Sequence, residues 1–252
     1  MKRLWLGLAL LLLVPSLVFA SGNVLIQDNP WGTNAPNEAD MAAAVGSYTE
    51  YNFTVPASTV FNNSTCCFVF MEGGDGTQSE FESYLTANSS TILNWVSNGG
   101  ALLLQTAGWN TPSTFNFANG TFTLDDNYTL SPSGTLTAAG VVAFPGTPTT
   151  QSGNYLAHDY VSFTGSPTVF MVTDNDGVSA IVAGERYGNG YIMFSGLTDS
   201  EFHFSGPSLN VDVIAYTAAQ AACGATPEPG TLVLMGSGIL GLAGLVRRKI
   251  NL

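Results

Sequence analysis

Two carboxylates and an imidazole at alternate positions form the best candidate for chemistry in this sequence: Asp199, Glu201 and His203. A carboxylate beside an imidazole can orient it as a base, and the same side chains can bind a metal ion. The alternative is a polar, acidic loop at the rim of a domain. We favour the loop, because neither Thr106 nor Ser195 lies in the Gly-x-Ser-x-Gly turn that presents a nucleophile. The three residues therefore remain candidates, and no catalytic residue is assigned.

Further polar and aromatic side chains follow the predicted strands, where open α/β sheets place their ligands. We expect a ligand rim formed by Asp28, Trp31, Glu72, Asp75 and Trp109. The two tryptophans would stack on sugar rings if they flanked one cleft. The glycines of segment 72–76 could present backbone N–H groups to an anion, although a tight strand-to-helix connection needs the same glycines.

Two other groups have simpler explanations. His158 with Asp159 is expected on a surface loop. Segment 174–177 resembles the start of a calcium loop but lacks the glutamate that such a loop requires downstream, so a hairpin turn is the better interpretation. No cysteine spacing suits zinc, and neither a metal site nor a cofactor is predicted, although a divalent cation could act as a counter-ion.

The elements that would position these residues are clearest between residues 66 and 105. The continuous apolar runs 66–71 and 101–105 predict two buried strands. Between them, a stripe at helical spacing is formed by Phe81, Leu85, Ile92 and Val96. Thr77 and Glu80 are expected to form a capping box at the start of this helix. Strand, helix and strand of these lengths predict a right-handed parallel crossover.

Residues from about 108 to 166 are rich in Thr, Ser, Asn, Gly and Pro. We interpret them as a β-rich insertion, with a lid over a site as the alternative. The strands expected after it, 168–172, 180–183 and 191–194, are separated by glycine-containing turns that predict hairpins. A closing helix over 207–222 would turn Leu209, Val213 and Tyr216 inward.

Charge is distributed unevenly along the chain, whose formal net charge is −12. Arg186 is the one basic residue between residues 21 and 226, so binding to nucleic acid or to anionic lipid is not expected. Among the cysteines, Cys223 could form a disulfide with Cys66 or Cys67 in an exported protein. Three unpaired thiols are the alternative, and we favour it because a sequence carries no geometry.

Both ends of the chain have the character of targeting segments. Residues 1–20 predict a signal peptide, with Lys2 and Arg3 before an apolar core and a cleavage site after Ala20. Near the other end, the uncharged run 231–246 predicts a short transmembrane helix, somewhat below the usual length of about 20 residues. The basic residues that follow it should stay on the cytoplasmic side, and they are Arg247, Arg248 and Lys249.

The order of features in residues 226–252 resembles a PEP-CTERM sorting signal. The motif residues are Pro227, Glu228 and Pro229, followed by the Gly/Leu-rich span and the basic cluster. The resemblance implies a bacterial protein that crosses the inner membrane, is anchored there by its C-terminal helix and is processed by the membrane enzyme exosortase. It further implies the cell surface or medium as the destination and an association with exopolysaccharide and biofilm.

The central region, residues 21–224, resembles the class I glutamine amidotransferase-like group of flavodoxin-type domains. The resemblance rests on the first strand ending at Asp28, the strand and Gly-rich turn 68–76, the helix leading into 99–104, and the closing segment 188–196. It implies a three-layer α/β fold with a mostly parallel sheet. Catalytic members carry a cysteine just after the strand that here is 101–105, whereas this chain has Thr106-Ala-Gly108. The nucleophile of that family is therefore absent.

Two functions remain open at this point. The first is a non-catalytic surface or matrix protein that binds a polysaccharide or another matrix component. The second is an extracellular hydrolase of a carbohydrate or amide that uses Asp199, Glu201 and His203, with or without a divalent metal. We favour the first, because the amidotransferase nucleophile is missing and the domain is acidic.

Overall fold

The computed structural model describes residues 22–63, 65–106, 114–124, 133–152, 156–174, 176–199 and 208–223. The predicted signal peptide, the transmembrane span 231–246, the sorting motif and the basic cluster lie outside these residues. Within the described part, no helix combines the length and the apolar character needed to cross a membrane.

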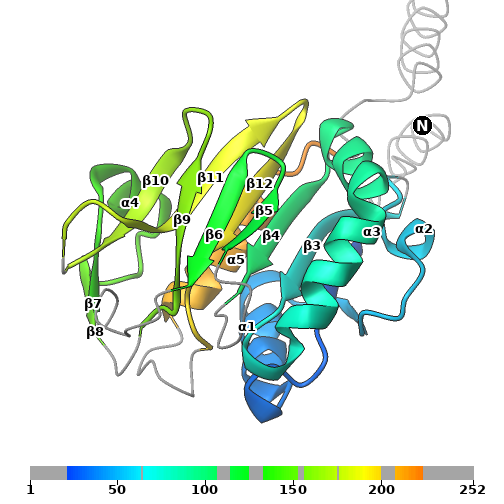
Figure 1. The fold of residues 1–252 in the computed structure, drawn as a ribbon, viewed down its shortest axis with the longest axis horizontal. Coiled ribbons are helices and arrows are strands. Elements are labelled where there is room, and N and C mark those ends of the chain that lie inside the picture. Colours follow the sequence, from blue (N-terminus) through cyan, green and yellow to red (C-terminus); the bar gives the residue numbers. More distant parts are fainter. Residues whose placement is uncertain are drawn as a thin grey trace, which may run out of the picture.

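The first half of the chain alternates strands and helices (Figure 1). Its elements are β1 (Gly22–Ile26), η1 (Pro30–Gly32), α1 (Ala35–Val45), β2 (Thr49–Tyr51), α2 (Ala57–Val60), β3 (Cys66–Glu72), η2 (Asp75–Thr77), α3 (Gln78–Ser97) and β4 (Ala101–Gln105). The predicted strand–helix–strand unit is confirmed, since β3 and β4 pair in parallel and α3 lies between them in sequence. The prediction of a capping box is wrong, because the Thr77 side chain does not cap the helix and its hydroxyl donates to Gly74 O instead.

The second half is mainly strands. Its elements are β5 (Thr114–Phe117), β6 (Gly120–Leu124), β7 (Ser133–Leu136), α4 (Ala138–Ala143), β8 (Thr150–Ser152), β9 (Asp159–Phe163), β10 (Thr168–Thr173), β11 (Ala180–Tyr187), β12 (Gly190–Ser195) and α5 (Ser208–Ala218). The predicted hairpins are confirmed, because β10 pairs antiparallel with β11 and β11 with β12.

These strands form one mixed sheet of twelve, and the prediction of a mostly parallel, flavodoxin-like domain is wrong. The main path is β2-β1-β3-β4-β12-β11-β10-β7-β8, of which the pairs from β2 to β12 are parallel. All pairings beyond β12 are antiparallel. The sheet also curls strongly, because β9 pairs with both β11 and β6 and brings β6 over β12. A Cβ on Gly120 of β6 would lie 2.5 Å from the Phe194 ring, which shows how closely the layers approach.

Apolar side chains fill both faces of this sheet. On one face, the predicted stripe of α3 is fully buried, with Trp95 between its members and the β6–β9 layer beside it. On the other face, α1 and α5 pack together, with Met41, Leu209 and Val213 at 0% exposure. Figure 1 shows α3 in front of the sheet and α1 and α5 behind it. The closely packed strands β3, β4 and β12 therefore form the rigid centre that positions the residues described next.

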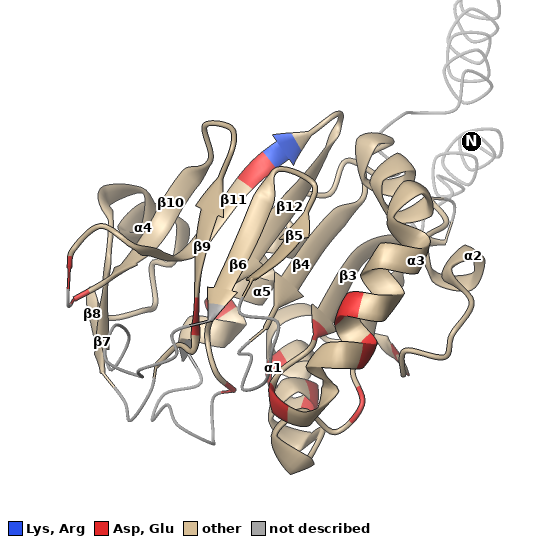
Figure 2. Ribbon diagram, viewed as in Figure 1, with Lys and Arg blue, Asp and Glu red and all other residues tan. Residues whose placement is uncertain are grey.

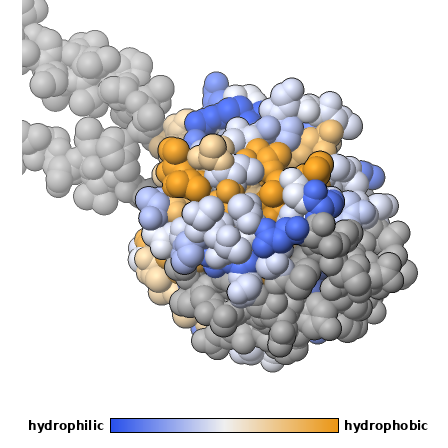
Figure 3. Space-filling model, turned by 90° about the vertical axis from the view of Figure 1, so that its left-hand side faces the viewer, coloured by the Kyte–Doolittle hydropathy of each residue, from blue (hydrophilic) through white to orange (hydrophobic). Residues whose placement is uncertain are grey.

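Apolar side chains also reach the surface near α4. Val141 and Val142 of this helix are 47% and 82% exposed, and Val178 in the turn between β10 and β11 is 79% exposed. Figure 3 shows apolar side chains gathered on the face at this end of the sheet.

Candidate functional site

Polar side chains meet at the carboxyl ends of the central parallel strands, as the topology of an open parallel sheet favours. Glu72 ends β3, Gln105 ends β4 and Ser195 ends β12, and all three are at most 1% exposed. Asp159 at the start of β9 and Asp199 after β12 are also buried, at 2% and 1% exposure. We call Glu72, Gln105, Asp159, Ser195 and Asp199 the buried polar cluster.

Glu72 has a strongly perturbed environment in this cluster. Its burial raises the pKa of the carboxyl well above the usual value, and the nearby charges of Asp199 and Asp159 raise it further. The backbone N–H of Gly74 donates to Glu72 Oε1 at 2.9 Å and opposes the shift. The Gln105 amide also favours the charged form, although its Nε2 does not reach hydrogen-bond geometry with any described residue. Desolvation has the largest effect, so Glu72 stays protonated at pH values well above those at which a glutamate ordinarily ionises.

His158 lies inside the molecule next to this cluster, and its predicted place on a surface loop is wrong. The side chain is 0% exposed, and its ring meets the indole of Trp31 edge-on, with centroids 5.3 Å apart. The backbone N–H of His158 donates to Gly196 O at 3.1 Å, which fixes the start of β9 against the end of β12. A histidine in a Thr/Ser-rich segment carries no periodic signal, so its burial could not be inferred from the sequence.

The predicted ligand rim divides between buried and exposed positions. Trp31 is 6% exposed and packs over Gly74, where a Cβ would lie 2.5 Å from the indole Nε1 and 2.7 Å from Glu72 Oε1. Asp28 and Asp75 are partly exposed in the loops after β1 and β3. Trp31 and Asp75 have positive φ angles of 59° and 46°, a strained conformation that proteins often keep at functional sites. Trp109 lies outside the described residues.

The side chains considered as nucleophiles are engaged in other bonds. Ser195 Oγ donates to Gln105 Oε1 at 3.0 Å and accepts from the Leu197 N–H at 3.3 Å. Thr106 Oγ1 donates to Gly73 O at 3.5 Å. Asp199 belongs to the buried polar cluster, whereas Glu201 and His203 lie outside the described residues. In the part of the chain that the structure describes, no three His, Cys, Asp or Glu side chains come together in an arrangement suited to a metal ion.

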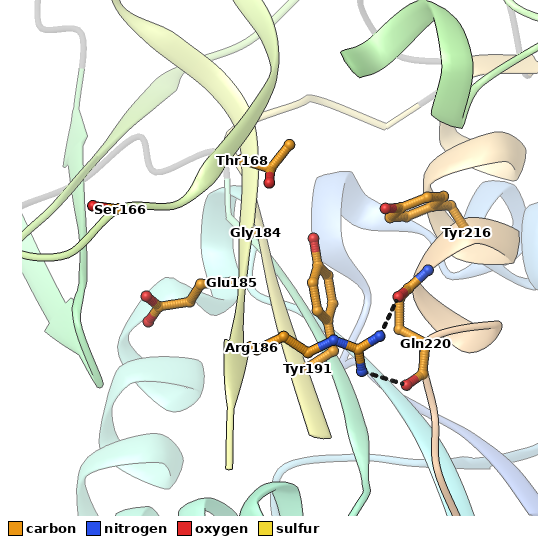
Figure 4. Close-up of a pocket in the computed structure, with 8 residues that line it drawn as sticks. All are labelled: Ser166, Thr168, Gly184, Glu185, Arg186, Tyr191, Tyr216 and Gln220. Atoms are coloured by element: carbon orange, nitrogen blue, oxygen red, sulfur yellow. Dashed lines mark hydrogen bonds between the residues drawn. The ribbon is translucent and has the colours of Figure 1, made fainter. Parts of the chain in front are cut away.

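A separate pocket of about 420 Å³ opens at the other end of the sheet, beside α5 (Figure 4). It is lined by Ser166, Thr168, Gly184, Glu185, Arg186, Tyr191, Tyr216 and Gln220. Arg186 is the second-to-last residue of β11. Figure 2 shows a blue segment near the end of β11, whereas most of the red acidic segments lie around α1, the first turns of α3 and the carboxyl ends of the central strands.

Arg186 organises this pocket. Its guanidinium lies over the Tyr191 ring, 5.5 Å from the centroid, and donates to Gln220 O at 3.2 Å and to Gln220 Oε1 at 2.8 Å. Figure 4 shows these side chains and Tyr216 facing one another, with Glu185 pointing away on the other side of β11. A guanidinium has five N–H donors, so donors remain for a ligand. Such a held cation is preorganised for recognition.

The Tyr191 hydroxyl adds a buried polar group to the pocket. The residue is 5% exposed, and its Oη meets no partner at hydrogen-bond geometry among the described residues. Burial, and then the nearby Tyr216 hydroxyl, raise the pKa of Tyr191, so this hydroxyl stays protonated. No local pattern in the sequence predicts these residues as a site, because they come from distant segments of the chain. The one available signal was Arg186, the single basic residue of the predicted exported part.

Comparison with protein families finds a match to the PEP-CTERM protein-sorting motif over residues 225–249. The predicted sorting motif is thereby confirmed, and it marks the chain as an exported protein that is processed at the membrane and associated with the surface. The motif is the recognition signal of exosortase. Comparison with curated proteins finds no match.

Solved structures resemble the chain at low sequence identity. A β-galactosidase from Bacillus circulans sp. alkalophilus has a TM-score of 0.49 at 10% identity, and the match covers 79% of this chain but 31% of that enzyme. The chain thus spans about a third of its length. A putative GMP synthase protein from Thermoplasma acidophilum has a TM-score of 0.50 at 9% identity, with 79% and 95% covered. A cytoplasmic protein from Salmonella typhimurium has a TM-score of 0.52 at 9% identity, with 79% and 98% covered. The last two share the fold with this chain, and a glutamine amidotransferase-like domain is not confirmed.

Proposed function

We propose that the domain is a non-catalytic, surface-associated binding protein whose ligand is an uncharged saccharide of the extracellular matrix. The observation that carries the proposal is the pocket at Arg186, Tyr191, Tyr216 and Gln220. Its volume of about 420 Å³ falls within the range of roughly 300–1,000 Å³ that is typical of small-ligand sites.

The pocket offers the groups that a sugar needs. The partly exposed ring of Tyr216 is an apolar surface for the C–H face of a sugar, and the amide of Gln220 and the hydroxyl of Thr168 suit its hydroxyl groups. Arg186 would act here as a fixed set of hydrogen-bond donors. The seventeen acidic residues among residues 21–226, against this one basic residue, would repel a polyanionic chain, so an uncharged polysaccharide is the better ligand class.

The hydrolase alternative is less well supported. Glycoside hydrolysis usually needs two carboxyl groups that flank an accessible bond. Glu72, Asp159 and Asp199 are at most 2% exposed, and the Ser195 hydroxyl is engaged with Gln105. The burial of these groups favours a structural role for the cluster, in which the cluster joins β3, β4, β9 and β12.

Affinity gel electrophoresis tests the proposal. The exported domain is run through gels that contain an uncharged polysaccharide, such as a β-glucan or a galactomannan, and through gels that contain polygalacturonate. We expect retardation by an uncharged polymer, insensitivity to salt and no retardation by the polyanion. Arg186→Gln should weaken binding by about tenfold, equivalent to about 1.4 kcal/mol.

A matched control separates the loss of the Arg186 contact from the change in net charge. Asn189→Asp changes the net charge by the same amount three residues away, in the exposed turn between β11 and β12, and should bind like the wild type. Equal loss in both variants, or no binding to any uncharged polymer, would contradict the proposal. Release of sugar that disappears in Asp199→Asn or His203→Ala would favour the hydrolase.

Processing by exosortase is the second part of the proposal and is tested by intact mass. Protein recovered from the cell surface and medium should end near Pro227 or carry an added glycan or lipid. A mass that includes Leu252 would instead indicate a protein that keeps its C-terminal anchor.

A further inference from the structure

The three cysteines of the chain lie together, although 156 positions separate Cys67 from Cys223. Cys66 and Cys67 begin β3, and Cys223 follows α5. All three are free thiols in this structure. Cys223 Sγ lies 3.9 Å from the backbone oxygens of both Cys66 and Cys67.

A β-bulge distinguishes the two adjacent cysteines. In the pairing of β1 with β3, Gly22 lies opposite Cys66 and Asn23 opposite Phe68, so Cys67 is the extra residue. Bulges redirect side chains relative to the regular alternation of a strand. Cys66 packs in the α3 core, where its thiol donates to Phe68 O at 3.4 Å. Cys67 belongs to neither apolar core, and its thiol interacts with that of Cys223.

The segment that carries Cys223 is held in place next to β3. The Ala222 N–H donates to Gly99 O at 2.8 Å, and Cys223 Sγ lies 3.2 Å from the same oxygen. Gly99 has a φ of +112°, and a Cβ there would lie 3.3 Å from the backbone of Ala222. This close approach fixes the chain at the end of α3 and keeps the Cys223 sulfur beside the bulge.

The environment of Cys223 also suits thiol chemistry. The neighbouring Cys67 thiol and the Asn63 amide lower the pKa of Cys223 to about 7 against the opposing effect of burial. The Cys223 thiol and burial raise the pKa of Cys67. Cys223 is therefore the nucleophile of the pair, because the thiolate is the reactive form.

We propose that Cys67 and Cys223 form a disulfide after export, with Cys66 left as a buried free thiol. The oxidant is a disulfide-bearing molecule outside the inner membrane, such as an exported thiol oxidase or oxidised glutathione. The Cys223 thiolate attacks it, forms a mixed disulfide and releases one oxidant thiol. Cys67 then loses its proton, attacks the Cys223 sulfur and displaces the second oxidant thiol. Two thiols lose two electrons and two protons, and the oxidant gains both.

The bond would lie two residues before the matched sorting motif, which begins at residue 225. It would tie the point where the chain continues toward the motif directly to β3, a fully buried strand. A pulling force on the sorting segment would then be borne by the sheet and would not detach α5 from the face of the sheet.

Thiol labelling of the exported full chain tests this assignment. Cells are quenched in acid, and the denatured protein is alkylated with N-ethylmaleimide without reduction, digested and analysed by mass spectrometry. We expect one labelled cysteine per chain, and fragmentation between the adjacent residues should place the label on Cys66. A cross-linked peptide pair should contain Cys67 and Cys223.

Cys66→Ser provides the matched check and should carry no label while keeping the cross-link. If export yields too little protein, the purified reduced chain in a glutathione redox buffer should give the same pair. Three labels in the wild type, or a label on Cys67 or Cys223 with Cys66 cross-linked, would overturn the proposal.

Discussion

The proposed Cys67–Cys223 disulfide should contribute strongly to stability, because it closes a long loop. The separation of 156 positions corresponds in the chain-entropy relation to about 5 kcal/mol of unfolding free energy at 25 °C. Native-state strain commonly lowers such gains to about 2–4 kcal/mol. For a domain of this size, that difference shifts the melting temperature by roughly 4–16 °C.

Thermal unfolding of the oxidised exported domain, with and without reductant, measures this difference. The reductant should lower the melting temperature of the wild type by that amount. It should change nothing in Cys67→Ser or Cys223→Ser, which already lack the bridge. Equal melting temperatures of oxidised and reduced wild type, with the cross-link verified by mass, would refute the reasoning that loop closure stabilises this domain.

Buried groups and close contacts lead to three more predictions. Because its pKa is raised, folded Glu72 keeps a proton that the unfolded chain releases above about pH 4.5. The stability of the fold should therefore fall as the pH rises from there, and Glu72→Gln should flatten the profile of melting temperature between pH 4 and 8. An unchanged profile would contradict the raised pKa of Glu72. Gly74→Ala should cost about 1–3 kcal/mol in urea unfolding because its Cβ meets Trp31 and Glu72, whereas Gly76→Ala, with nothing within 4 Å, should change stability by less than about 0.5 kcal/mol. In the reduced protein, iodoacetamide should label Cys223 with a half-maximal rate near pH 7, and a midpoint above pH 8 would refute the effect of the neighbouring Cys67 thiol on Cys223.

The central part of the fold could be predicted because its signals are local. The continuous apolar runs of β3 and β4 and the stripe on α3 leave little choice of structure, and their lengths require a parallel crossover. The predicted fold class is wrong because the apolar runs of the central strands indicate a parallel sheet, whereas the later strands are joined by short turns and pair antiparallel. Two-residue and short glycine turns, such as the one between β11 and β12, can join antiparallel strands but not parallel ones.

The sites were harder to predict, since each depends on contacts between distant segments. Glu72 and Asp199 could be selected because they follow strands. His158 could not, because the return of β9 along β6 and β11 buries it and no local pattern encodes that return. Likewise, the pocket joins Arg186 of β11 to Gln220 after α5, and the bulge at Cys67 becomes visible only when β1 lies beside β3.

The measurement that tests the central claim most directly is a saturation-transfer NMR experiment on the exported domain with uncharged oligosaccharides. Binding without catalysis predicts transfer to the sugar protons in the wild type and in Asn189→Asp. It predicts weaker transfer in Arg186→Gln, in line with its tenfold lower affinity, and no new reducing ends on prolonged incubation. New reducing ends, or undiminished transfer in both Arg186→Gln and Tyr216→Ala, would contradict the claim that this pocket binds saccharide without turning it over.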